Sequence, residues 1–167
     1  MALENRKIYG LIGFPLTHSF SKTYFNNKFE SEGINAEYVN FEIPDIGDLM
    51  EVVAEYPELS GLNVTIPYKR AVMEYLDELS PLAERMGNVN TITRLPDGRL
   101  HGDNTDYFGF QCLVEELGVE VAGKKALVLG ATGGAGTTAS MVLGDMGAIV
   151  VPVGRTSEVN YDNIAQQ

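Results

Sequence analysis

One segment constrains the fold of this chain more than any other. In residues 126–155 an aliphatic run, ALVLG, leads into the glycine-rich turn GATGGAG, a helical stretch, TTASMVLGDMG, and a second aliphatic run, AIVVPVGR. Consecutive strands joined by a crossover helix lie parallel in the same sheet. The segment therefore predicts one complete βαβ unit, and with it an α/β fold.

The first hundred residues show the same alternation of strand and helix signals. Short aliphatic and aromatic runs predict strands at 8–13 (IYGLIG), 36–43 (AEYVNFEI) and 61–66 (GLNVTI). The segment 90–103, NTITRLPDGRLHGD, alternates around Pro96-Asp97-Gly98 and predicts a hairpin. These signals predict an α/β fold with a mostly parallel sheet in a three-layer arrangement.

Three helix predictions are specific enough to check. Asp45 is expected to cap a helix that buries one face, formed by Ile46, Leu49, Met50 and Val53. Pro67 is expected in the first turn of the helix that follows the third strand. The helix at 105–118 is expected to end at Gly118 and to bury Phe110, Leu113, Val114 and Leu117.

Charge and cysteine content limit the classes of function. The 12 Lys and Arg residues and 23 Asp and Glu residues give a net charge of −11, which argues against nucleic acid and anionic membranes as partners. Cys112 is the only cysteine, and His18 and His101 are too isolated to form a metal site, so no metal is expected. With no signal peptide or membrane span in the sequence, we expect a soluble, cytoplasmic protein.

The segment NVTIPYKR, residues 63–70, predicts a site for a polar ligand. In a strand, Leu62, Val64 and Ile66 would point into the core while Asn63 and Thr65 point to the other side. Ligands of open α/β sheets bind beyond the carboxyl ends of the strands, where Lys69 would join them. The side chains of Asn63, Thr65 and Lys69 suit a polyhydroxylated substrate. The alternative is that they cap neighbouring backbone and that the lysine is solvated.

Two further segments favour a binding site over simple capping. PLTHSFSK (15–22) places Ser19 and Ser21 at a junction of loop and helix, where hydroxyl and backbone N–H groups suit a carboxylate. GDNTD (102–106) places Asp106 at the start of a long helix. Capping explains each segment when it is taken alone.

The order of these motifs identifies a family resemblance. GFPLTHSFS, NVTIPYK, NVNT (88–91), GDNTD and a glycine-rich βαβ turn follow one another as in shikimate dehydrogenase, and the resemblance runs from about Ile8 to Thr156. It implies two domains: a substrate domain, residues 1–104, and a partial Rossmann-type NAD(P)-binding domain, residues 105–167, which consists of a linker helix and the βαβ unit. It also implies that Ser19 and Ser21 hold the shikimate carboxylate, that Lys69 and Asp106 are the catalytic pair, and that the ring hydroxyls contact Asn63, Thr65, Asn90 and Asp106.

The same resemblance implies a cofactor site. Its residues would be Gly130, Ala131, Gly133, Gly134, Ala135, Gly136, Arg155 and Thr156. Arg155 stands where an NAD enzyme usually has an acidic residue, so NADP is the expected cofactor. Three features depart from the family pattern: the glycine-rich loop is one residue longer at Thr132, Gly154 replaces the usual asparagine, and Glu158 follows where a basic residue is typical. Two alignments of the dinucleotide-binding motif remain open, one through Gly130, Gly133 and Gly136 and one through Gly134, Gly136 and Ala139.

The expected function is the NADP-dependent reduction of 3-dehydroshikimate to shikimate in aromatic amino-acid (chorismate) biosynthesis, by a monomer or homodimer. Family members continue well beyond 167 residues, so this chain is expected to be a fragment. One alternative is a quinate/shikimate dehydrogenase with relaxed use of NAD and NADP. A second is a small-molecule-binding module without catalysis.

Overall fold

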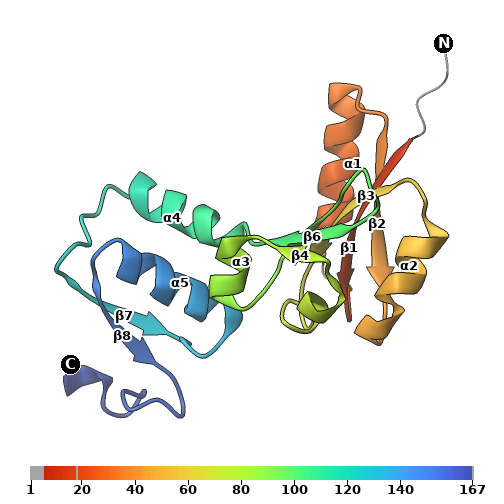
Figure 1. Ribbon diagram of the computed structural model, residues 1–167. Helices are drawn as coiled ribbons and strands as arrows, with labels where there is room; N and C mark the ends of the chain where they lie inside the picture. Colours follow the sequence, from red (N-terminus) through yellow and green to blue (C-terminus); the bar gives the residue numbers. More distant parts are fainter. Residues whose placement is uncertain (1–5, 18, 167) are drawn as a thin grey trace. The chain divides into compact units, whose positions relative to one another are not determined.

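The computed structural model describes residues 6–17 and 19–166, and the chain divides into two compact units, Met1–Asn104 and Thr105–Gln167 (Figure 1). His18 therefore lies outside the described residues. Each unit combines strands and helices, which confirms the predicted α/β class. No helix in the described ranges is long and apolar enough to cross a membrane.

The first unit is built on a six-stranded sheet with the strand order β2-β1-β3-β5-β6-β4. Its strands are β1 (Lys7–Gly13), β2 (Ala36–Glu42), β3 (Leu59–Val64), β4 (Glu78–Leu79), β5 (Thr91–Arg94) and β6 (Leu100–Asp103). Strand β1 runs parallel to β2 and β3, and β4 runs parallel to β6. Strand β5 is antiparallel to both of its neighbours, β3 and β6. The predicted mostly parallel sheet and the β5–β6 hairpin are thus confirmed.

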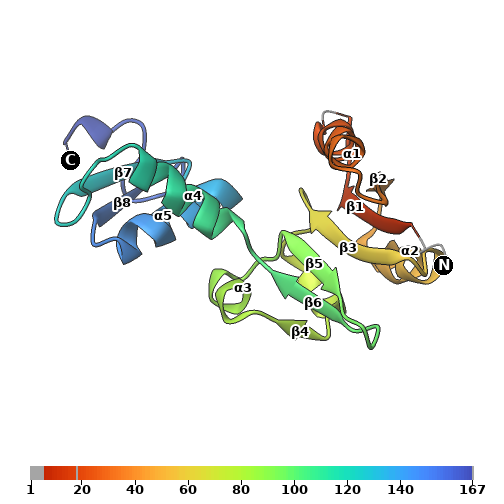
Figure 2. The same ribbon diagram turned by 90° about the horizontal axis from the view of Figure 1, so that it is seen from above.

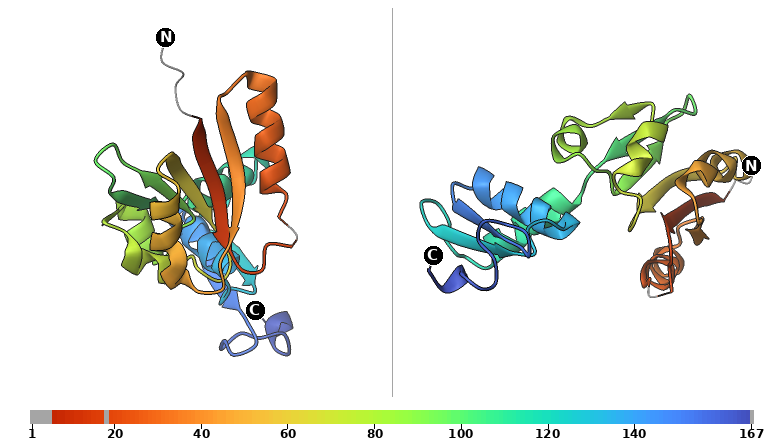
Figure 3. Two further views of the ribbon diagram at one scale, coloured as in Figure 1. Left: turned by 90° about the vertical axis from the view of Figure 1, so that its right-hand side faces the viewer. Right: turned by 90° about the horizontal axis from the view of Figure 1, so that it is seen from below.

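Helices cover both faces of this sheet. Helix α1 (Ser21–Glu32) lies on one face, and α2 (Leu49–Glu55) and α3 (Pro81–Met86) lie on the other (Figures 2 and 3). The larger core is on the α2 side, where Leu49, Val53 and Ala83 join the buried side chains of the strands. A smaller cluster on the α1 side includes Leu11 and Tyr38. This is the predicted three-layer arrangement.

The second helix begins later than the sequence predicts. Asp45 does act as a cap, since its Oδ1 accepts the Gly47 N–H at 2.8 Å, but the turn that it starts is a 3-10 helix, Ile46–Asp48. A 3-10 helix has 3.0 residues per turn and an α-helix has 3.6, so the side chains of the α-helix that follows are rotated relative to the face predicted for a continuous α-helix. Val52 is buried as a result, and Met50, predicted to be buried, is 49% exposed.

The prediction for the end of the third strand is wrong in two places. Strand β3 ends at Val64, and the Tyr68 N–H donates to the Thr65 carbonyl oxygen at 2.9 Å, which closes a turn. Because the chain turns there, Ile66 is 75% exposed instead of buried. Pro67 lies in the turns before a 3-10 helix, Ala71–Tyr75, and does not begin an α-helix.

The second unit contains the predicted βαβ unit. Strands β7 (Lys125–Leu129) and β8 (Ile149–Val153) pair in parallel around helix α5 (Gly134–Asp145), and a 3-10 helix, Ile164–Gln166, follows. Helix α4 (Asp106–Glu116) lies against α5, where the Tyr107 hydroxyl donates to Asp145 Oδ2 at 2.6 Å.

Helix α4 ends as expected, but it buries less than expected. Gly118 follows it with a φ of 63°, the left-handed conformation that closes many helices. Val114 is buried, whereas Leu113 and Leu117 are 58% and 75% exposed and Phe110 is half-buried. The predicted face is wrong for these three because α4 has its main contacts with α5 alone.

Candidate functional site

Backbone hydrogen bonds join the three segments that carry most of the predicted substrate residues. The Val64 N–H donates to the Asn90 carbonyl oxygen at 2.8 Å, and the Val89 N–H donates to the Lys69 carbonyl oxygen at 2.7 Å. The Thr65 N–H donates to the carbonyl oxygen of Ile12, at the end of β1, at 3.0 Å. Asn63, Thr65, Lys69 and Asn90 are therefore attached to one connected edge of the sheet, at the carboxyl ends of β1 and β3.

Strand β3 separates apolar from polar side chains as the alternation predicts. Leu62 and Val64 are 3% and 2% exposed and belong to the larger core, while Asn63 is half-buried on the α1 side. The Asn63 Oδ1 accepts a hydrogen bond from the Tyr38 hydroxyl at 2.8 Å. The orientation of the Asn63 amide is thus fixed by a residue on β2 that the sequence analysis did not single out.

Asn90 is more deeply buried than Asn63, with 8% of its surface exposed. The Thr91 hydroxyl donates to Asn90 Oδ1 at 2.9 Å, and the Asn90 N–H donates to the Asp103 carbonyl oxygen at 3.1 Å. Both the side chain and the backbone of Asn90 are therefore held in place.

Ser19 and Ser21 stand at the start of helix α1. Ser21 is the first helical residue, and its N–H donates to the Ser19 hydroxyl oxygen at 3.3 Å. The N-cap residue of α1 is Phe20 and has no side-chain capping bond, so neither serine is the N-cap of this helix. Burial raises the pKa of Tyr38 to about 12, and the polar side chain of Ser21 opposes that increase. Of the predicted substrate residues, Tyr38 hydrogen-bonds to Asn63.

A buried polar network supports the same edge from below. Asn104 is fully buried and Asn88 is 6% exposed, and the Asn104 amide donates to the Asn88 side-chain oxygen and, at 3.3 Å, to the Asn88 carbonyl oxygen. Asp103 Oδ1 accepts from the Ser80 hydroxyl at 2.6 Å and from the Asn104 N–H at 2.7 Å. The network links the GDNTD and NVNT segments, and the sequence analysis noted neither asparagine as a structural partner.

Asp106 is the first residue of α4, after Thr105 at the N-cap position, and it is half-buried. It belongs to the second unit, so its pairing with Lys69 and its contact with substrate stay predictions.

The glycine-rich turn of the second unit has distinct structural roles for two of its glycines. Gly130 has a φ of 72°, so it turns the chain out of β7 in a conformation that side chains disfavour. A Cβ added at Gly136 would lie 2.2 Å from the Gly130 carbonyl oxygen, so only glycine permits this approach of α5 to the turn. Gly133 is the N-cap residue of α5. These roles support the alignment through Gly130, Gly133 and Gly136.

The end of β8 and the glycine-rich turn line one cavity of about 310 Å³. Its lining residues are Gly130, Thr132, Gly154, Arg155, Thr156 and Tyr161. A Cβ added at Gly154 would lie 3.4 Å from Thr132 Cγ2. Two of the three departures from the family pattern are therefore neighbours: the extra residue of the loop, Thr132, lies beside Gly154, which replaces the usual asparagine.

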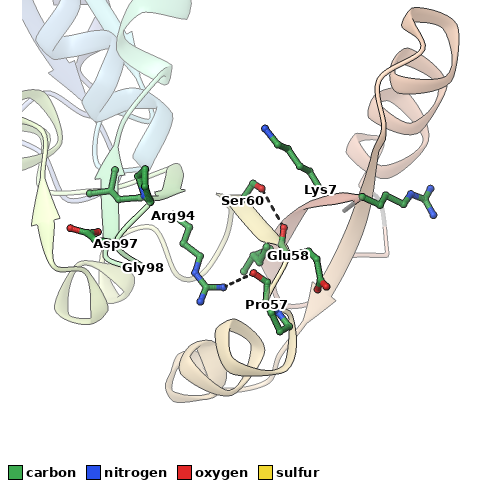
Figure 4. Close-up of a pocket in the computed structure, with 11 residues that line it drawn as sticks. Lys7, Pro57, Glu58, Ser60, Arg94, Asp97 and Gly98 are labelled. Atoms are coloured by element: carbon green, nitrogen blue, oxygen red, sulfur yellow. Dashed lines mark hydrogen bonds between the residues drawn. The ribbon is translucent and has the colours of Figure 1, made fainter. Parts of the chain in front are cut away.

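The first unit also has a cavity of about 580 Å³ at the opposite ends of β1 and β3 (Figure 4). Arg94 lines it and donates to the Tyr56 carbonyl oxygen at 3.2 Å, at the C-terminal end of α2. None of the predicted site residues lines this cavity. Within the described ranges there is also no cluster of His, Cys, Asp and Glu that could hold a metal ion.

Comparisons with known proteins agree with this geometry. Residues 11–92 match the family described as the shikimate dehydrogenase substrate binding domain. Shikimate dehydrogenase (NADP(+)) of Symbiobacterium thermophilum is 45% identical over 143 residues, which cover 84% of this chain and 48% of that protein.

Solved structures give the same result. Shikimate 5-dehydrogenase of Listeria monocytogenes, crystallised with shikimate and NAD, is 35% identical with a TM-score of 0.80, covering 98% of this chain and 56% of that one. The Thermus thermophilus enzyme in complex with NADP(H) and shikimate is 35% identical with a TM-score of 0.77, covering 90% and 56%.

The chain spans about half the length of the curated relatives that it matches. Over that span it shares their substrate-domain profile, their fold and more than a third of their residues. It belongs to the shikimate dehydrogenase family.

Proposed function

We propose that this chain carries the substrate domain, residues 1–104, and the first part of the NADP-binding domain, residues 105–167, of a shikimate dehydrogenase. The reaction is the reversible reduction of 3-dehydroshikimate to shikimate in the biosynthesis of chorismate and the aromatic amino acids. We place the protein in the cytoplasm as a monomer or homodimer.

The observation that carries this proposal is the connected edge of the first sheet. The segments with Asn63, Lys69 and Asn90 are joined there by backbone hydrogen bonds of 2.7 and 2.8 Å. Their amide and ammonium groups match a ligand with several hydroxyls. Ser19 and Ser21, at the start of α1, add hydroxyl and N–H donors that suit its carboxylate.

The chemistry follows from these groups. Reduction of a ketone adds a hydride to carbon and a proton to oxygen, and NADPH, when bound, supplies the hydride. Lys69, as an ammonium, donates the proton to the developing alkoxide, and in the reverse direction it takes the proton from the hydroxyl. Asp106 would orient the lysine and the hydroxyl. Asn63, Thr65 and Asn90 hold the ring, so that the reacting carbon is presented in one orientation.

The second unit has groups that fit a dinucleotide. The first N–H groups of α5 follow the glycine-rich turn, and a helix N-terminus favours a pyrophosphate there. Arg155 lines the adjoining cavity together with Thr156, where a guanidinium suits a 2′-phosphate. These features favour NADP over NAD.

Two alternatives keep specific support. Gly154 and Glu158 depart from the typical NADP pattern, which favours a quinate/shikimate dehydrogenase with relaxed cofactor use. The second alternative is a module that binds shikimate without catalysis, which the connected edge of the first sheet would support equally well.

The proposal is tested by mapping ligands on the ¹⁵N-labelled chain by NMR. Shikimate is expected to shift the amides of Ser21, Asn63 and Asn90, and NADP⁺ to shift those of residues 133–136 at lower concentration than NAD⁺. Equal response to NAD⁺ and NADP⁺ would favour relaxed cofactor use, and a stronger response to quinate would favour the quinate enzyme. Absence of any shift with shikimate and quinate would contradict the assignment of the substrate domain.

A further inference from the structure

We propose that Tyr38 is a positioning residue of the substrate site, whose hydroxyl donates to the Asn63 amide oxygen and so turns the NH₂ group of that amide toward the ligand. The inference rests on the proposed function for the identity of the ligand. It adds to that function a residue outside every motif that carries the family resemblance.

The Tyr38 ring is held rigidly on β2. The residue is 2% exposed, and the Asn26 side chain binds its backbone twice, accepting from the Tyr38 N–H and donating to the Tyr38 carbonyl oxygen, both at 2.9 Å. Phe25 stacks on the ring with centroids 4.7 Å apart and planes 18° from parallel. Both partners come from α1, so the helix that starts at Ser21 also fixes the tyrosine.

The hydrogen bond to Asn63 decides which end of the amide is offered to a ligand. A primary amide has an oxygen that accepts and a nitrogen that donates. The Tyr38 hydroxyl donates to Asn63 Oδ1 at 2.8 Å, so rotating the amide by half a turn would put an NH₂ group in place of that acceptor and leave the buried Tyr38 O–H without it. Because burial keeps the pKa of Tyr38 near 12, the phenol remains a donor throughout the neutral range.

A fixed donor at Asn63 selects ligands by the group that faces it. A hydroxyl or carbonyl oxygen can accept from the NH₂ group, whereas a C–H or an ammonium leaves it without an acceptor. A site built to hydrogen-bond a ligand hydroxyl discriminates strongly against an analogue that lacks it. Tyr38 thereby makes the site selective for an oxygen at this position of a hydroxylated carboxylate.

The test is a double-mutant cycle in the 167-residue chain, with shikimate affinity measured by calorimetry. Tyr38→Phe keeps the ring and removes the hydroxyl, and loss of one hydrogen bond predicts a Kd about 3- to 10-fold higher. In an Asn63→Ala background the same change is expected to alter the Kd less than about twofold, because the positioned group is gone. Tyr68→Phe is the matched control. It removes a buried hydroxyl that donates to the Ile43 carbonyl oxygen at 2.7 Å and is expected to leave the Kd unchanged.

A merely structural role would raise the Kd equally with and without Asn63, and that result would overturn the proposal, as would an unchanged Kd in Tyr38→Phe. A second readout needs no ligand: the side-chain ¹⁵NH₂ signals of Asn63 are expected to shift and broaden in Tyr38→Phe and to stay in place in Tyr68→Phe. If the wild-type chain ignored shikimate while these signals responded, the substrate assignment would fail and the positioning role would stand. Unchanged signals would refute the positioning role whatever the ligand.

Discussion

The buried pair Asn88 and Asn104 allows a quantitative prediction about how the candidate site is held. Replacing Asn104 with alanine removes two donated hydrogen bonds, to the side chain and to the backbone carbonyl of Asn88. Each contributes about 0.5–1.5 kcal/mol, and the Asn88 oxygen that remains buried without its donor costs a further 1–3 kcal/mol or so. We expect Asn104→Ala to lower the free energy of unfolding of the first unit by about 2–6 kcal/mol.

The corresponding change at Asn88 should cost less. Asn88→Ala removes the side-chain bond to Asn104 and the bond that the Asn88 amide donates to the Met86 carbonyl oxygen at 3.1 Å, but Asn104 keeps its bond to the backbone carbonyl oxygen of residue 88, so the expected loss is about 1–3 kcal/mol. The double variant should fall short of the sum of the single losses by about 1 kcal/mol, because both single changes remove the same bond.

Native-state hydrogen exchange is the suitable assay because it reports on the two units separately. The amides of Leu62 and Val64 report on the first unit, and the amide of Val128 in β7 serves as an internal control that should not change. Asn27→Ala, at an exposed position of α1, is a matched substitution that should stay within about 0.5 kcal/mol. A loss below about 0.5 kcal/mol for Asn104→Ala, or strictly additive losses in the double variant, would refute the reasoning.

Three further predictions follow from burial and close contacts. Leu49→Ala, at a fully buried position of α2, should destabilise the first unit by about 2–5 kcal/mol, whereas Met50→Ala at the neighbouring exposed position should change it by less than about 0.5 kcal/mol in urea denaturation. Gly136→Ala forces a Cβ against the turn backbone and should cost about 1–3 kcal/mol of stability and weaken NADP⁺ binding, while Gly134→Ala, whose Cβ would meet open space, should change the stability by less than about 0.5 kcal/mol; equal losses of stability would be contradictory. Burial raises the pKa of Tyr38 from 10.0 to about 12 in the folded state. The free energy of unfolding should therefore be unaffected by this group below pH 10 and fall by about 1.4 kcal/mol per pH unit between pH 10 and 12. In Tyr38→Phe, pH-dependent denaturation should show a correspondingly smaller loss of stability over this range.

Local patterns in the sequence predicted the features of the fold that are determined by residues close together in the chain. The alternation of Asn63 with Leu62 and Val64 follows from the two-residue period of a strand, and the βαβ unit follows from strand, glycine turn and helix in succession. The left-handed Gly118 at the end of α4 is also a local signal.

Features that depend on distant contacts could not be read in this way. Tyr38 and Asn63 are 25 residues apart, and no periodicity marks either as the partner of the other. Asn88 and Asn104 meet across 16 residues for the same reason. The burial of Leu113 was predicted from helical spacing alone, but spacing shows only that a face is apolar and not that another element covers it.

The most direct test is the binding of shikimate to the 167-residue chain, measured by calorimetry beside quinate and the variant Asn63→Ala. We expect saturable binding that prefers shikimate, weakens at least about tenfold in Asn63→Ala and is unchanged in the exposed control Asn27→Ala. A folded chain that binds neither ligand, or that binds shikimate equally well without the Asn63 amide, would contradict the assignment of the substrate site to this edge of the sheet.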